Sequence, residues 1–157
     1  MRGIRKEASK IMITTRSARV ATIGFAAASG LALLGVAPAQ AAPAIPLNTG
    51  QEVPAPTSKG AHGSFSYEID GTELCYTLEV TGLSTPAVAA HIHVAPRNVP
   101  GPIVVPLMVE NATEFELSAC TTASAELLEA IQADPAAYYV NVHTPTNQPG
   151  EVRGQLK

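Results

Sequence analysis

The chain has 157 residues, of which 46% are hydrophobic and only 4% aromatic, and its formal net charge at pH 7 is −3. Beyond residue 41, four lysines and arginines stand against twelve aspartates and glutamates, so this part of the chain has a net charge of −8. Because nucleic-acid binding requires clustered basic side chains, the composition excludes nucleic acid as the expected partner.

The first 41 residues have the features of a signal peptide. Basic residues recur from Arg2 to Arg19, an apolar stretch rich in Ala and Gly covers residues 20–36, and Ala39-Gln40-Ala41 fits the A-x-A cleavage rule. We therefore predict cleavage after Ala41, a single domain at residues 42–157, and a secreted, extracytoplasmic protein with no membrane association after cleavage. The alternative is a retained membrane anchor, for which the apolar stretch is short.

The first part of the predicted domain contains a hairpin. Residues 42–59 are rich in Pro, Ala and Thr, so we expect irregular structure with one short strand at 45–47. Residues 63–69 and 74–80 each alternate between apolar and polar side chains, as strands with one buried face do. Asp70-Gly71 between them is typical of a tight hairpin turn.

The second part adds more strands and one helix. Pro106 places its strand at a sheet edge or a bulge, because proline has no N–H for a central ladder. A short helix should run from a cap at Thr121 or Thr122 through Ile131. The expected fold is all-β, an antiparallel Ig-like or Greek-key β-sandwich with one short helix. The remaining strands are predicted at residues 88–94, 103–109, 113–117, 138–143 and 151–156.

Cys75 and Cys120 are the only cysteines in the chain. Export to an oxidising compartment favours a disulfide between them. Two free thiols or two soft metal ligands are the alternatives, but no C-x-x-C spacing supports the second of these.

Three of the four histidines lie in two predicted strands. His91 and His93 are two residues apart, so they project from one face of their strand. His143 projects from the face of another strand that also carries Tyr139 and Asn141. In both strands the apolar residues point the other way, so we expect these polar side chains on the outside of the sheet. Neutral imidazoles suit copper and zinc, so His91, His93 and His143 are the predicted metal ligands.

An H-x-H pair on one strand plus a histidine on another is similar to the copper ligand set of Cu/Zn superoxide dismutases. The sequence has no bridging-histidine segment and no zinc-loop pattern. The alternative is a structural role, with the ring nitrogens bonded to loops or to carboxylates across the sheet. A metal site requires that the three rings converge on one point, and widely separated rings would exclude it.

Arg153 and Glu151 follow His143 across one turn of the chain. An arginine beside a metal site could steer small anions toward it. The simpler expectation is a salt bridge from Arg153 to Glu151 or another acid, which is worth less than about 1 kcal/mol when exposed.

Several blocks of the sequence follow one family pattern in order. They are Gln51-Glu52-Val53-Pro54 and residues 74–83, 89–93, 101–107, 139–144 and 149–156. Together they resemble the CHRD domain, a family named from the animal protein chordin and widespread in exported microbial proteins. The resemblance implies a β-rich domain outside the cytoplasm and does not specify an activity.

The usual enzyme signatures are missing from the sequence, which has no nucleophile elbow, phosphate-binding glycine loop, H-E-x-x-H or EF-hand spacing. We therefore expect an extracytoplasmic binding or structural module rather than an enzyme, with a metal ion or an extracellular protein as its partner. The alternative is a copper- or zinc-binding protein that uses His91, His93 and His143 and has dismutase-like redox chemistry.

Overall fold

The structure is a computed structural model that describes residues 44–157. The predicted signal peptide, residues 1–41, lies outside the described residues. Among residues 44–157, the structure contains no helix that is both long enough and apolar enough to cross a membrane.

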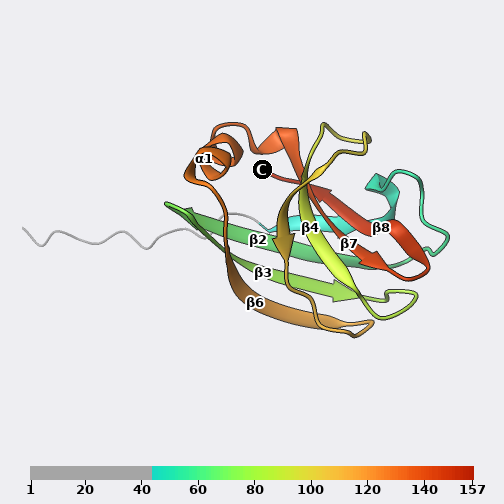
Figure 1. The fold of residues 1–157 in the computed structure, drawn as a ribbon. Coiled ribbons are helices and arrows are strands. Elements are labelled where there is room, and N and C mark those ends of the chain that lie inside the picture. The colour runs from blue at the N-terminus through green and yellow to red at the C-terminus, as the bar shows by residue number, and fades with distance from the viewer. Residues whose placement is uncertain (1–43) are drawn as a thin grey trace, which may run out of the picture. The chain divides into compact units, whose positions relative to one another are not determined.

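The described part of the chain contains eight strands and one α-helix (Figure 1). Each of the eight predicted strands is present, which confirms the all-β assignment. The strands are β1 (Ile45–Asn48), β2 (His62–Asp70), β3 (Glu73–Thr81), β4 (Ala89–Val94), β5 (Ile103–Leu107), β6 (Phe115–Thr122), β7 (Tyr138–Thr144) and β8 (Asn147–Gln155), and the helix is α1 (Ala125–Ala133).

All eight strands belong to one antiparallel sheet, in the order β5-β4-β7-β8-β1-β2-β3-β6. The sheet curls into a nearly closed barrel (Figure 1). The predicted Ig-like sandwich of two separate sheets is not confirmed, because the short strand β1 pairs with β2 on one side and with β8 on the other. Alternation along a strand shows that one face is buried, but it does not distinguish two packed sheets from one curled sheet.

The two edge strands of the barrel are β5 and β6. The edge position of β5 confirms the prediction made from Pro106. A side chain from the barrel interior reaches the chain that follows this edge, since the Tyr76 hydroxyl of β3 accepts a hydrogen bond of 2.6 Å from the backbone N–H of Met108. This contact ties β3 to the segment after β5 without a further ladder of strand pairing.

The core consists of the apolar side chains that alternate inward from the strands, together with one face of α1. Phe65, Leu78 and Ile92 have no exposed surface. Leu128 and Ile131 of α1 are equally buried and join the same cluster. Full burial of a side chain of this size contributes about 1.5–3 kcal/mol, so the helix is held mainly by its two buried residues.

The helix begins later than predicted. Thr121 and Thr122 belong to β6, where they pair with β3, and the N-cap is Ser124. The Ser124 hydroxyl accepts a hydrogen bond of 3.2 Å from the N–H of Leu127, as a capping serine does. Pairing with the neighbouring strand therefore continues β6 through both threonines and leaves the cap to the next hydroxyl residue.

Cys75 and Cys120 form a disulfide, as predicted. The two residues are directly opposite each other on β3 and β6, and they lie on the outer face of the sheet. The bond therefore attaches an edge strand to its only neighbour in the sheet. It adds a covalent link at a place where hydrophobic burial of side chains contributes little to stability.

Removal of this bond should destabilise the domain. The disulfide closes a loop of 45 residues, and the chain-entropy model assigns about 4 kcal/mol to a loop of that length. We expect the Cys75→Ser/Cys120→Ser variant to lose up to about that free energy of unfolding in urea denaturation.

The matched control is Thr77→Ala/Ser118→Ala. These hydroxyls are also opposite each other on β3 and β6, on the same outer face, and are joined by a hydrogen bond of 2.8 Å. Their loss should cost less than about 1 kcal/mol. Equal losses from the two double variants would show that the covalent link has no special role.

Candidate metal centre

Pairing between β4 and β7 places the three histidines on one surface. Directly opposite residues of antiparallel strands project from the same face of a sheet, so the side chains of His91, His93 and His143 leave the barrel together. Ile92, between the first two, points inward and is fully buried. The register pairs His91 with Asn141, His93 with Tyr139, and Ala89 with His143.

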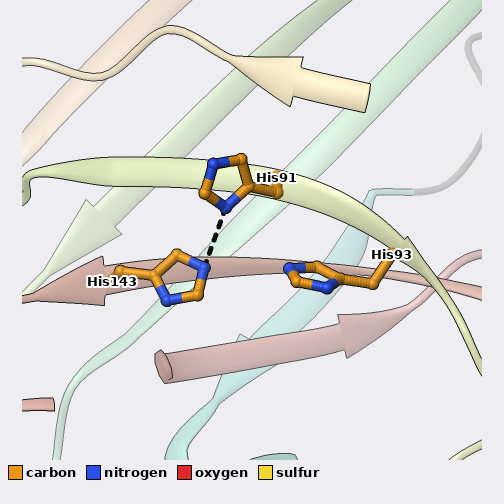
Figure 2. A group of neighbouring side chains, drawn as sticks. All are labelled: His91, His93 and His143. Atoms are coloured by element: carbon orange, nitrogen blue, oxygen red, sulfur yellow. Dashed lines mark hydrogen bonds between the residues drawn. The ribbon is translucent and has the colours of Figure 1, made fainter. Parts of the chain in front are cut away.

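The three imidazoles converge (Figure 2). One ligand nitrogen from each of His91, His93 and His143 lies within 4.8 Å of the other two. His91 Nδ1 and His143 Nε2 are joined by a hydrogen bond of 3.0 Å. Figure 2 also shows one nitrogen of the His93 ring turned toward the other two rings. The three rings therefore converge on one point rather than pointing apart.

Backbone carbonyls fix two of the rings. His93 Nδ1 donates a hydrogen bond of 2.8 Å to the carbonyl of Gly101, and His143 Nδ1 donates one of the same length to the carbonyl of Gln148. Since a carbonyl only accepts, each Nδ1 carries the proton and each Nε2 keeps its lone pair. Metal-bound histidines are oriented in this way by the group that accepts from the other nitrogen.

The surroundings keep all three histidines neutral. Burial and the neighbouring His143 and His93 rings lower the pKa of His91 from the ordinary 6.5 to about 4. Burial also lowers the pKa of His93 and of His143, more than the hydrogen bonds to the carbonyls raise it. His93 and His143 are only 7% and 9% exposed. Because only neutral imidazole binds a metal, lone pairs are available at neutral pH.

A close approach of the chain at Gly101 makes the contact to His93 possible. A Cβ atom added at Gly101 would lie 2.1 Å from the carbonyl oxygen of Val94, so any other residue would push this segment away from β4. The Gly101 N–H donates a hydrogen bond of 3.2 Å to the Tyr139 hydroxyl. The Tyr139 ring stacks on His93 with 4.8 Å between the ring centres. His93 is therefore held both at its edge and on its face.

Arg153 lies in this region, but neither of its predicted roles matches its surroundings. The side chain has no exposed surface, and its two terminal nitrogens donate to the carbonyls of Val99 and Pro96 at 3.0 Å. The guanidinium carbon lies 3.3 Å from the centre of the Tyr139 ring. Arg153 forms no hydrogen bond to Glu151, and its guanidinium does not face the solvent from which an anion would approach. Burial lowers its pKa, against the charge of Glu52, which raises it.

Glu151 is bound by hydroxyl groups instead of by Arg153. Its carboxylate has no exposed surface and accepts hydrogen bonds from Ser58, Ser84 and Thr144. Burial raises the pKa of Glu151, but these hydrogen bonds outweigh burial, so the pKa is lowered overall. Since Thr144 follows His143 directly, this carboxylate anchors the turn whose Gln148 carbonyl holds the His143 ring.

Two further residues of this surface were not predicted as site residues. Asn141 is 1% exposed and lies on β7 between Tyr139 and His143, on the face that carries the histidines. Glu52 is 4% exposed and lies against Asn141, because its Oε2 accepts a hydrogen bond of 3.5 Å from Asn141 Nδ2. Alternation along the strand was a sufficient signal for Asn141. Nothing in the sequence placed Glu52 beside β7.

Among the described residues, no further histidine, cysteine or carboxylate joins the group formed by the three histidines. His62 is exposed on β2 and lies outside the histidine cluster. A second group of metal-ligating residues consists of Glu73, Cys75 and Cys120, but both sulfurs are consumed in the disulfide. The three histidines are therefore the one group in residues 44–157 with free ligand atoms for a transition metal.

The fold and site together define an antiparallel β-barrel domain with a cluster of neutral histidines on its outer face. The model of the CHRD domain matches residues 44–156, and the chain belongs to that family. No curated protein and no solved structure matches this chain. CHRD domains are extracellular, and the Cys75–Cys120 disulfide agrees with that location.

The free energy of unfolding of the metal-free protein should decrease as the pH decreases, because His91 has a lowered pKa in the folded state. In the unfolded chain this histidine takes up a proton near pH 6.5, whereas in the folded protein it does so only near pH 4. The stability that it contributes is complete above pH 6.5 and is lost as the pH falls toward 4. We expect the urea midpoint to decrease between pH 7.5 and pH 5, and to decrease less in His91→Gln.

His62→Gln serves as the control, because it removes a histidine outside the cluster. It should retain the pH dependence of the unaltered protein. An identical decrease in His91→Gln and in the unaltered protein would contradict the lowered pKa of His91.

Proposed function

We propose that this protein is an extracytoplasmic metal-binding module that holds one copper or zinc ion with His91, His93 and His143. The observation that carries the proposal is the convergence of the three ligand nitrogens within 4.8 Å of one another. Nitrogens bonded to one ion at about 2.0–2.1 Å are at most about 4.2 Å apart. Small ring movements therefore suffice to bring all three to a common ion.

The donor set favours particular ions. Three neutral imidazoles suit copper and zinc, whereas magnesium and calcium prefer oxygen ligands. The hydrogen bonds from His93 to Gly101 and from His143 to Gln148 supply the outer partners that metal-bound histidines have. The remaining ring, His91, is the most exposed of the three, so an ion bound there would be accessible from that side.

A dismutase-like activity has weaker support than metal binding. That chemistry needs an anion to reach the metal, and the one nearby cation with that expected role, Arg153, is fully buried beneath the Pro96 and Val99 carbonyls. We therefore propose binding as the function, with the copper-loaded protein in a superoxide assay as the test of the second candidate.

Metal titration is the direct test of the proposal. The protein, expressed by export and stripped of metal, should bind one equivalent of Cu(II) or Zn(II), and His91→Ala/His93→Ala should bind none tightly. Binding should also raise the melting temperature, because free metal at 100 times Kd stabilises the folded state by about 2.7 kcal/mol.

His62→Ala is the matched control, since it removes a histidine that is not part of the cluster. It should bind the same single equivalent as the unaltered protein. Weak binding that is the same in all three proteins would assign the three histidines a structural role.

A further inference from the structure

Two buried acceptor atoms beside the three histidines have no hydrogen-bond partner. They are Nε2 of His93 and Oδ1 of Asn141. The two residues lie on the same face of neighbouring strands, because Asn141 is opposite His91, which is two positions from His93. Buried polar atoms in folded proteins are almost always paired, so an unpaired atom needs an explanation. Here two such atoms occur together at one place.

The orientation of the Asn141 amide is determined by its other contacts. Its Nδ2 donates to the carbonyl of Pro149 at 3.2 Å and to the carboxylate of Glu52 at 3.5 Å. Rotating the amide by 180° would place Oδ1 against these two acceptors. The oxygen must therefore occupy the opposite side of the amide, away from Pro149 and Glu52.

Gly150 fixes the position of the same amide. This residue has φ of +141°, and a Cβ atom there would lie 2.1 Å from Glu52 Oε2 and 2.7 Å from Asn141 Nδ2. The carboxylate and the amide thus pack directly against the backbone, at a point where only glycine leaves room for them. Neither group can shift toward Gly150 to satisfy the unpaired oxygen.

The His93 ring is equally constrained. Because its Nδ1 donates to Gly101, its Nε2 presents a lone pair. Two lone pairs in one buried place require a donor or a cation between them. The unpaired donor on this face, Arg153 Nε, makes no hydrogen bond to either atom. Asn141 is opposite His91 and lies between Tyr139 and His143 on β7, so an ion held by the three histidines would lie on the same face as the unpaired amide oxygen.

We propose that the amide oxygen of Asn141 is the fourth ligand of the metal held by His91, His93 and His143. This inference rests on the proposed function and makes the site a set of three nitrogens and one oxygen. Glu52 acts as a positioning residue, since its carboxylate accepts from Asn141 Nδ2 and holds the amide with its oxygen toward the metal.

The test compares metal affinity in the full chain, expressed by export, with and without this oxygen. Asn141→Leu preserves the size of the side chain and removes the ligand atom. We expect its Kd for Zn(II) and Cu(II) to rise by roughly 10–100-fold, as for other losses near a metal. Gln155→Leu is the matched control, because it replaces another buried amide of the same polar face that is bonded to Ala95 and Ala136. Its Kd should be unchanged.

A measurement on the unaltered protein covers the case in which Asn141→Leu fails to fold. With ¹³C-labelled asparagine, the side-chain carbonyl resonance of Asn141 should shift when Zn(II) is added, and that of Asn147 should not. A shift of the histidine resonances without a shift at Asn141 would overturn the fourth ligand while leaving the proposed function intact. Failure of the unaltered protein to bind either ion would instead overturn the proposed function itself.

Discussion

The antiparallel register between β4 and β7 is the constraint on which the site depends. It places His91 opposite Asn141 and His93 opposite Tyr139, so that side chains from two distant parts of the sequence leave the barrel side by side. A shift of one residue would turn every one of them into the core. The buried valines and isoleucine on the other face of these strands therefore fix the histidines in place without contacting them.

Charged groups on this face are buried, yet they are not paired with one another. Glu151 accepts from hydroxyl groups, Arg153 donates to carbonyls, and Glu52 accepts from an amide. Neutral dipoles thus bind the charged groups, except at Arg153 Nε, which has no partner. The contacts of Arg153 and Glu52 tie loops to β8 and β7. The outer face of β4, β7 and β8 is therefore buried although its side chains are polar. This burial keeps the imidazoles neutral at the pH at which metals bind.

Much of this arrangement follows from the sequence, because alternation determines which face of a strand a residue occupies. It places His91, His93 and His143 together on the outside, and the two cysteines, with the export signal predicted before them, indicate the disulfide. Alternation does not determine how far a sheet curls or which loop covers its outer face. The burial of Arg153 depends on carbonyls in the loop after β4, and no local pattern predicts that contact.

The edges of the open barrel have a consequence for the protein at high concentration. An unpaired strand is a template on which a second molecule can add its own strand and begin to aggregate. Along β5, Pro106 offers no N–H to such a strand. On β6, Glu116 presents a charge and Cys120 is covalently held to the sheet. Both edge strands, β5 next to β4 and β6 at the other end of the sheet, therefore resist intermolecular pairing. The barrel can stay open without an edge that favours aggregation.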